Sequence, residues 1–356
     1  MTPDATLARL REYMVGPTRF MSLLSAFELG LIDTLREHPG ASAAHLGEAA
    51  GTTPDAVEQL LFLLVKEGFV AHDEAAGTYT LDALAAVPVA DLDRALAYMN
   101  LIKVTALRQL FHLTESARTG TVVGLKELYG ASGTLYDAVG DHPDLNESWL
   151  TLMNSVTAHI DPWFFDTIDI PAGSRVLDVA GNTGLGAIHA YRHQASPGLK
   201  VTTFDLPGKE SEALANFRAA GLQEHLSFIG GDVFEEIPQG YDVVLVKHFL
   251  DMFDKADVVR ILQGVHKALR VGGTVNVLVP VYPEDIKDTG NYNVDFFPAF
   301  FIGAAMGQGG PQKLSVYERW LRECGFEVTR AVTRDTAQIP PDVIPVQAVL
   351  TATKTA

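Results

Sequence analysis

The chain has 356 residues, of which 44 are acidic and 27 basic, giving a formal net charge of -17. This length accommodates two domains, and the negative charge argues against binding to nucleic acid or to an anionic membrane. Cys324 is the one cysteine, which excludes an internal disulfide and a multi-cysteine metal site. We expect no secretory leader, because the first ten residues contain no cationic segment followed by an apolar one, and no apolar run approaches about 18 residues. We therefore expect a cytoplasmic protein.

The N-terminal part has helical periodicity followed by a small hairpin. Apolar residues recur at three- and four-residue steps over 13–36. Two further helices are expected over 41–51 and 54–68, and short strands over 69–70 and 79–81 flank a turn-rich segment. Helix, helix, hairpin is the order of a winged helix.

Winged helices often bind DNA, but the charge of this one opposes that function. Residues 1–100 carry 6 basic and 14 acidic side chains, and the expected recognition helix contains Asp55, Glu58 and Glu67. Such a surface repels phosphates. The N-terminal helices also carry more apolar surface than so small a domain can bury. We interpret the region as a homodimerisation and substrate-covering scaffold, with a ligand-sensing DNA-binding regulator as the alternative.

The rest of the chain changes from helices to alternating strands and helices. Helices are expected over 90–116 and 145–165, and no internal repeat occurs. Apolar segments that alternate with helical stretches predict a parallel, Rossmann-like sheet with crossover helices and a final pair of strands. The segments are Arg175 to Val179, Lys200 to Phe204, Leu226 to Ile229, Tyr241 to Val246, Thr274 to Val281, Glu327 to Val332 and Val346 to Thr353. The predicted domains are 1–90, 91–165 and 166–356.

A glycine-rich turn follows the first of these strands. The sequence from Val176 to Gly186 predicts an apolar strand, a turn with Gly181 and Gly184, and then a helix. Glycine allows the backbone to approach a ligand and to adopt positive φ, which asparagine also tolerates at Asn182. The N–H groups at the start of the helix then face the ligand. This pattern predicts a nucleotide-type binding turn.

Carboxylates follow the next two strands. Asp205 and Leu206 come after one, where the acid can bind both hydroxyls of a ribose. Asp232, Val233 and Phe234 come after the other, offering a carboxylate for the adenine amino group and a ring for its face. The glycine spacing is not G-x-G-x-x-G, which disfavours NAD.

These motifs together resemble a known family. The glycine motif from Asp178 to Gly184, the Asp-Leu-Pro from Asp205 to Pro207, and Gly231-Asp232 with Phe234 are similar to those of the small-molecule O-methyltransferases of caffeate, hydroxyindole and bacterial secondary-metabolite type. Ala180 and Asn182 replace two of the family's glycines. The resemblance covers nearly the whole chain.

The resemblance implies a class I Rossmann-like domain that binds S-adenosylmethionine and releases S-adenosylhomocysteine, behind a winged-helix dimerisation domain. It predicts no metal. The expected cofactor-binding residues are Asp178, Ala180, Gly181, Gly184, Asp205, Leu206, Asp232, Val233, Phe234, Lys247 and His248.

The catalytic pattern of that family is altered. Its lysine is present as Lys247, but the position of its general-base histidine is Asp251. By ungapped alignment, the two glutamates that support this histidine in plant members correspond to Asn276 and Gln312. An ordinary aspartate, with a pKa of about 3.9, is a weak base for a phenol of pKa about 10. His248 is an alternative base.

The loss of the family's histidine and its two supporting glutamates favours methylation of a ring carbon over the O-methylation that is usual in the family. We expect a phenolic or amino-phenolic acceptor from secondary metabolism, such as antibiotic biosynthesis. O-methylation remains one alternative, and a cofactor-bound enzyme that does not methylate is another.

An aromatic-rich set is expected to contact the substrate, namely Met153, His159, Phe164, Phe297, Phe300 and Phe301. His189 and His193 lie one helical turn apart, which raises the question of a metal. Since no third ligand is evident, we interpret them as part of a solvated helix face.

Overall fold

The computed structural model describes residues 2–285, 287, 295–334 and 346–355. Contacts divide the chain into two compact units, with the division between Asn100 and Leu101. The domain boundaries expected at residues 90 and 165 stay predictions. Among the described residues, no helix combines the length and the apolar character needed to cross a membrane.

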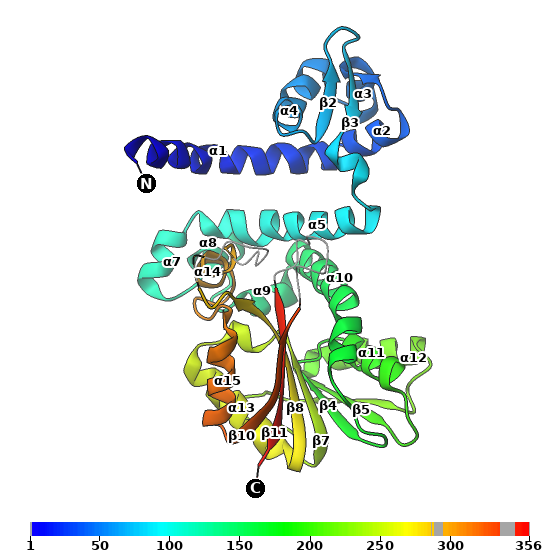
Figure 1. The fold of residues 1–356 in the computed structure, drawn as a ribbon, viewed down its shortest axis with the longest axis vertical. Coiled ribbons are helices and arrows are strands. Elements are labelled where there is room, and N and C mark those ends of the chain that lie inside the picture. Colours follow the sequence, from blue (N-terminus) through cyan, green and yellow to red (C-terminus); the bar gives the residue numbers. More distant parts are fainter. Residues whose placement is uncertain (1, 286, 288–294, 335–345, 356) are drawn as a thin grey trace. The chain divides into compact units, whose positions relative to one another are not determined.

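The first unit has the winged-helix order expected from the sequence (Figure 1). The antiparallel strands β2 and β3 follow α3 and α4, and β1 pairs with β3. Thr53 caps α4 because its side chain accepts a hydrogen bond from Ala56 N at 3.2 Å. Gly30, with φ of 69°, separates the first two helices. The elements are α1 (Pro3–Glu28), α2 (Leu31–Glu37), β1 (Ala41–Ser42), α3 (Ala43–Ala50), α4 (Pro54–Lys66), β2 (Val70–Asp73), β3 (Thr78–Leu81) and η1 (Ala83–Ala86).

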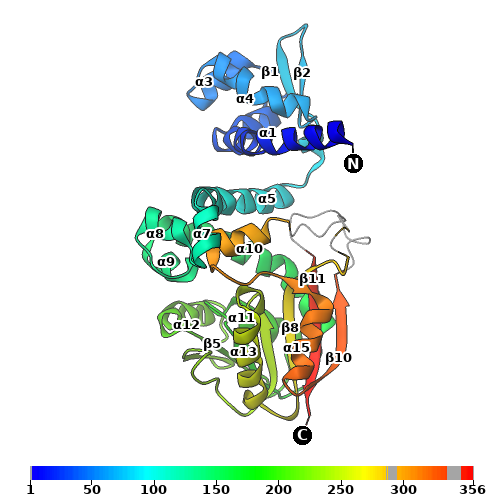
Figure 2. The same ribbon diagram turned by 90° about the vertical axis from the view of Figure 1, so that its left-hand side faces the viewer.

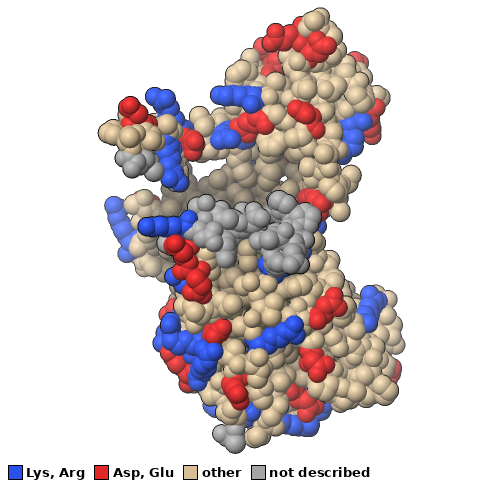
Figure 3. All heavy atoms as spheres, viewed as in Figure 1, with Lys and Arg blue, Asp and Glu red and all other residues tan. Residues whose placement is uncertain are grey.

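Charged side chains are mixed on the surface of both units. On the face drawn in Figure 3, acidic and basic side chains are interspersed, and the described residues form no continuous basic patch there. This distribution fits the acidic composition of the chain.

A helical segment precedes the sheet of the second unit. Its last helix, α10, has proline at its first position, which suits a helix start because the missing N–H has no intrahelical partner there. α5 (Val89–Leu101) closes the first unit, apart from Leu101. The helices of the segment are η2 (Ile102–Leu107), α6 (Arg108–Leu110), α7 (Leu113–Thr119), α8 (Val123–Tyr129), α9 (Leu135–Asp141) and α10 (Pro143–Thr167).

The strands of the second unit form one mixed sheet in the order β10-β11-β8-β7-β4-β5-β6, with β9 beside β8. The strands from β4 to β8 are parallel to one another, and β11 runs antiparallel to β8 and β10. The strands are β4 (Arg175–Val179), β5 (Lys200–Asp205), β6 (Leu226–Gly230), β7 (Tyr241–Lys247), β8 (Leu269–Tyr282), β9 (Gln312–Lys313), β10 (Phe326–Thr333) and β11 (Gln347–Lys354).

The sequence placed these strands correctly to within a residue or two, except that β9 was not expected and β8 begins earlier than expected. It starts at Leu269, which pairs with Tyr241, and the register shifts before Val243 pairs with Thr274. Gly272 and Gly273 therefore lie inside a strand at an irregularity.

Helices cover both faces of the sheet. α13 and α15 lie on one side, and α10, α11 and α12 lie on the other (Figures 1 and 2). Because both faces are covered, the central strands are almost entirely apolar. The carboxyl ends of β4, β5, β6 and β7 meet at one edge, which is where ligands bind in such sheets. The remaining helices are α11 (Leu185–Gln194), η3 (Pro207–Lys209), α12 (Glu210–Ala219), η4 (Leu250–Met252), α13 (Lys255–Ala268), α14 (Phe297–Phe300), η5 (Phe301–Ala305) and α15 (Leu314–Glu323).

Candidate active site

The loop after β4 is closely packed and unusual in its backbone angles. Ala180, Asn182 and Gly184 have φ of 56°, 50° and 78°. A side chain at Gly181 would lie 2.6 Å from Asp178 Oδ2, and one at Gly184 would lie 2.3 Å from an aromatic ring. Packing therefore requires the two glycines, whereas Ala180 and Asn182 hold left-handed angles at an energetic cost.

Asp178 lies beneath this loop, one residue before the end of β4. It is 1% exposed, and neither carboxylate oxygen has a hydrogen-bond partner among the described residues. Burial raises the pKa of Asp178 to about 6, although Lys247 opposes the shift. A buried carboxylate without donors is costly unless a ligand supplies one. Asp178 is therefore open to a ligand donor.

The carboxylates after β5 and β6 are held by backbone N–H groups. Asp205 accepts hydrogen bonds from Asn182 N and Leu206 N, each at 2.7 Å, so it ties the glycine loop to β5. Asp232 accepts one from Phe234 N at 2.8 Å. Burial raises the pKa of Asp205, and the two N–H donors oppose this. Carboxylate oxygens have further lone pairs, so both groups retain acceptor capacity.

The apolar neighbours of these acids differ in exposure. Leu206 is 56% exposed, whereas Val233 and Phe234 are half-buried. The Phe234 ring lies edge-on to Phe253, with centroids 5.3 Å apart, and beneath the Arg260 guanidinium at 4.8 Å. Phe234 is thus fixed beside the end of β6.

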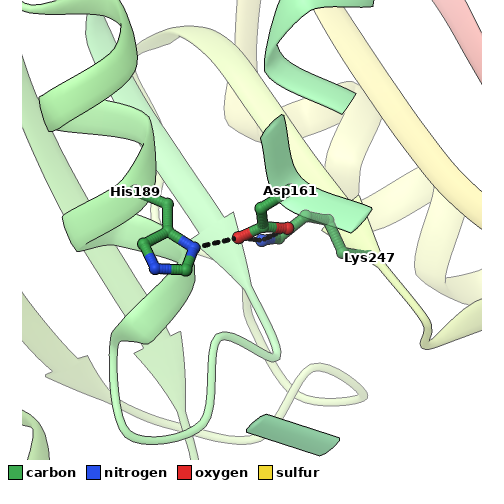
Figure 4. Close-up of polar contacts among 3 residues, drawn as sticks. All are labelled: Asp161, His189 and Lys247. Atoms are coloured by element: carbon green, nitrogen blue, oxygen red, sulfur yellow. Dashed lines mark hydrogen bonds and ion pairs between the residues drawn. The ribbon is translucent and has the colours of Figure 1, made fainter. Parts of the chain in front are cut away.

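A buried ion pair lies at the end of β7 (Figure 4). Lys247 Nζ is 2.9 Å from both carboxylate oxygens of Asp161, which comes from α10. His189 Nδ1, from α11, lies 2.8 Å from Asp161 Oδ2. Burial opposes ionisation of Asp161, but Lys247 and His189 hold its pKa below the usual value. Asp161 therefore joins α10, β7 and α11.

His248 follows β7 in a left-handed conformation, with φ of 49°. Its backbone N–H donates to Leu278 O at 2.8 Å, and its buried Nε2 has no hydrogen-bond partner among the described residues. Burial and the neighbouring Lys247 lower the pKa of His248 to about 4. The imidazole is therefore neutral at neutral pH and a weak base.

Asp251 lies in η4 and is 7% exposed. Its Oδ1 is buried without a hydrogen-bond partner among the described residues. Burial raises its pKa to about 7. Its backbone carbonyl accepts a hydrogen bond from Gly310 N at 2.7 Å, which places the segment before β9 against it. Of the two candidate bases, Asp251 has the pKa suited to proton transfer near neutral pH.

Three tyrosines from different elements surround Asp251. Tyr136 lies in α9, Tyr282 ends β8 and Tyr317 lies in α15. Burial raises the pKa of each, and the charge of Asp251 raises it further, to about 12 for Tyr282. The sequence did not predict these neighbours, because helices and a strand far apart in the chain supply them.

Comparison with known proteins agrees with this geometry. Residues 111–327 match the O-methyltransferase domain, and residues 12–91 match the O-methyltransferase dimerisation domain. The chain belongs to the O-methyltransferase family. It is a methyltransferase, and it has the class I fold that its structural neighbours also have.

Two curated relatives act on phenols according to their names. The methyltransferase is 28% identical over 340 residues to a 3-amino-4-hydroxybenzoate 4-O-methyltransferase of Streptomyces cremeus, covering 93% of this chain and 88% of the relative. It is 24% identical over 318 residues to an L-tyrosine C(3)-methyltransferase of Streptomyces lavendulae, covering 88% and 85%. Both oxygen and carbon acceptors therefore occur among its relatives.

A solved structure shares the fold over the whole chain. The apo form of the S-adenosylmethionine-dependent methyltransferase SibL is 25% identical, with a TM-score of 0.78, and the alignment covers 98% of this chain and 100% of that one.

The carboxylates of this methyltransferase fit S-adenosylmethionine. The cofactor presents hydrogen-bond donors along its length: an ammonium, two ribose hydroxyls and an adenine amino group. Asp178, Asp205 and Asp232 present acceptors at successive strand ends, and the oxygens of Asp178 have no competing donor among the described residues. Within that part of the chain, no cluster of three or more His, Cys, Asp or Glu side chains is arranged to hold a metal ion.

The expected substrate residues lie in separate places. Phe300 and Phe301 are 4% exposed and pack in one cluster with Met252, which Phe297 borders. Phe164 is fully buried elsewhere, and the centroid of its ring lies 5.8 Å from Lys247 Nζ. On α10, Met153 is half-buried, and His159 Nε2 lies 2.9 Å from Arg334 Nη2. The structure thus groups Phe297, Phe300 and Phe301 near Asp251 but not Phe164.

The two residues aligned with the family's glutamates lie in different surroundings. Asn276 is fully buried inside the sheet, where its Oδ1 accepts a hydrogen bond from Thr351 Oγ1 at 2.7 Å. Gln312 Nε2 donates to Gly310 O at 3.1 Å, in the segment that contacts Asp251.

We had expected the two histidines of α11 to belong to a solvated helix face, but each one pairs with an acid on α10. His189 pairs with Asp161, and His193 Nε2 lies 2.7 Å from Asp166 Oδ1. Sequence reasoning missed Asp161 entirely. The available signal was a pair of acids on α10, five residues apart, and a pair of histidines on α11, four residues apart.

Proposed function

We propose that this methyltransferase methylates a phenolic or amino-phenolic small molecule of secondary metabolism, at the ring carbon ortho to a hydroxyl. S-Adenosylmethionine supplies an electrophilic methyl group, and the transfer leaves S-adenosylhomocysteine and one proton from the acceptor. Asp178, Ala180, Gly181, Gly184, Asp205 and Asp232 would hold the cofactor.

The observation that carries this proposal is the environment of Asp251. A carboxyl with a pKa of about 7 exists in both protonation states near neutral pH, so it can accept a phenol proton and later return it. Removing that proton places negative charge on the ortho carbon as well as on the oxygen. Asp251 then returns the proton to the oxygen while the methylated carbon loses its own proton to water, which restores the aromatic ring.

O-methylation is the second candidate, and the 3-amino-4-hydroxybenzoate 4-O-methyltransferase supports it. The same Asp251 would accept the phenol proton, and the oxygen instead of the carbon would form the new bond. The L-tyrosine C(3)-methyltransferase supports methylation of a ring carbon. Both names support a phenolic acceptor.

A cytoplasmic homodimer is part of the same proposal. The dimerisation-domain match supports it, and so does the first half of α1, which exposes Leu7, Leu10, Tyr13, Met14 and Val15. Light scattering of the full chain should give twice the mass of one chain. A monomer at micromolar concentration would contradict the assembly but not the chemistry.

The deciding experiment uses methyl-labelled S-adenosylmethionine with a panel of phenols and phenolic amino acids. Product NMR distinguishes a ring methyl from a methyl ether. Cofactor binding without label transfer to any acceptor would favour the non-methylating alternative. Absence of cofactor binding, together with a gel shift on DNA fragments, would favour the regulator.

A further inference from the structure

The Lys247 side chain lies at the glycine loop. A Cβ added to Gly186, in the first turn of α11, would meet Lys247 Nζ at 2.5 Å and Asp178 Oδ2 at 2.9 Å. Both charged groups therefore border the same backbone. Only 9% of the Lys247 side chain is exposed, so water screens its charge weakly.

Both hydrogen bonds from Lys247 go to Asp161 and none to Asp178. Nζ lies 2.9 Å from each oxygen of Asp161, whose side chain is 2% exposed. The oxygens of Asp178 have no hydrogen-bond partner among the described residues. Asp161 thus holds the lysine and leaves the other carboxylate open.

This arrangement affects the charge that a bound cofactor meets. S-Adenosylmethionine carries a sulfonium and an ammonium, whereas S-adenosylhomocysteine keeps the ammonium and lacks the sulfonium charge. An unneutralised lysine beside them would repel the substrate cofactor more than the product, because the substrate has one positive charge more. A neutralised lysine would not discriminate.

We infer that Asp161 is a positioning residue that neutralises Lys247 and so keeps this site from disfavouring the cationic cofactor relative to its product. The inference rests on the proposed binding of S-adenosylmethionine near the glycine loop. A purely structural role is the competing explanation, since Asp161 also links three elements.

The chain offers a matched control for that structural role. His193 and Asp166 join the same two helices through a contact of 2.7 Å. The Asp166 side chain is 72% exposed and has no lysine partner among the described residues. Asp166→Asn therefore removes a helix-to-helix link without changing the charge at Lys247.

The test measures dissociation constants of the full-length protein for S-adenosylmethionine and S-adenosylhomocysteine by calorimetry. In Asp161→Asn, the ratio of the first constant to the second should rise roughly tenfold, which corresponds to about 1.4 kcal/mol. The ratio should return to within about twofold of wild type in Asp161→Asn/Lys247→Met, where both charges are gone. Asp161→Glu, which keeps the charge, and Asp166→Asn should also keep the wild-type ratio.

Equal weakening of both ligands in Asp161→Asn would overturn the inference and leave Asp161 a structural link. If Asp161→Asn alone fails to fold while the double variant folds, the unpaired lysine is the cause, which supports neutralisation. Failure of both variants to fold would contradict it. If wild type binds neither ligand, the proposed function fails instead.

Discussion

The two sides of the candidate site are built differently. On the cofactor side, Asp205 and Asp232 follow consecutive strands, and backbone N–H groups within a few residues or one loop away fix their oxygens. On the acceptor side, Asp251 has a buried oxygen without a donor among the described residues, and its tyrosine neighbours come from α9, β8 and α15.

This difference gives the two sides different chemistry. Donors from the backbone oppose the effect of burial at Asp205, so that its carboxylate is suited to binding. At Asp251 burial outweighs the one backbone hydrogen bond, from its own N–H, that opposes the shift, and the resulting pKa of about 7 suits proton transfer. Local sequence motifs can bind the cofactor, which is the same molecule in every reaction. The surroundings of Asp251 depend instead on how distant elements pack, so they can differ from one acceptor to another.

The strongest test of this contrast is Asp251→Asn. The change keeps the shape of the side chain but removes its ability to accept a proton, so turnover should fall by ~10²–10⁴. Affinity for S-adenosylmethionine should change less than about twofold. Full turnover in the variant would make Asp251 structural and direct attention to His248.

Asp254→Asn is the matched control for this variant. Asp254 lies three residues later, is exposed and caps α13 by accepting a hydrogen bond from Asp257 N at 2.9 Å. Asparagine caps helices about as well as aspartate, so this variant should retain wild-type turnover.

The pH dependence of the reaction should show the same carboxyl. Asp251 must be ionised to accept a proton, so kcat/KM should fall about tenfold per pH unit below its pKa of about 7. Neither the neighbouring tyrosines nor His248 titrates in this range, because burial raises the pKa of Tyr136, Tyr282 and Tyr317 and lowers that of His248 to about 4. Asp178, on the cofactor side, has a pKa of about 6, so the fall in rate between pH 7 and pH 6 is the part that reports Asp251. A profile that is flat from pH 5 to 8 would remove Asp251 from the role of base.

The same group links folding stability to pH with a definite sign. The folded protein binds a proton at Asp251 more tightly than the unfolded chain does, since burial raises the pKa from 3.8 to about 7. Its contribution is therefore greatest below about pH 4 and is lost as pH rises through 7. Denaturant titrations should show this decline in wild type relative to Asp251→Asn. An equal slope in both proteins would mean that the carboxyl is not desolvated.

The contrast also explains how far the sequence could predict the molecule. Strand ends and the glycine loop follow from local patterns, so Asp178, Asp205 and Asp232 were found at the predicted edge. Asp161 and Lys247 are 86 positions apart, and no local pattern joins them. The tyrosines around Asp251 likewise depend on how two distant helices and a strand pack. Strand ends can be located from the periodicity of the sequence, whereas contacts between residues far apart in the chain cannot.

A smaller effect is expected on the cofactor side. Asp205→Ala should weaken S-adenosylmethionine binding by at least about tenfold, because it removes an acceptor for the ribose and releases Asn182 N from the glycine loop. The control is Asp242→Ala, whose carboxylate pairs with Arg270 at 2.8 Å at the start of β7. Calorimetry that gives the same affinity for Asp205→Ala and wild type would show that the ribose lies elsewhere.

The smallest effect concerns Ala180, where the chain departs from the family's glycine. Its φ of 56° is left-handed, which costs a non-glycine residue about 1–2 kcal/mol. Ala180→Gly removes that cost but adds about 0.4–1 kcal/mol of conformational entropy to the unfolded chain. The net result should be a gain of roughly 0.5–1 kcal/mol in the free energy of unfolding, with cofactor affinity unchanged because the loop keeps its angles. Ala187→Gly, in the helical conformation of α11, should instead cost about 1 kcal/mol. If both variants lower the melting temperature equally, Ala180 is not strained, and the loop tolerates alanine for a reason other than its backbone angle.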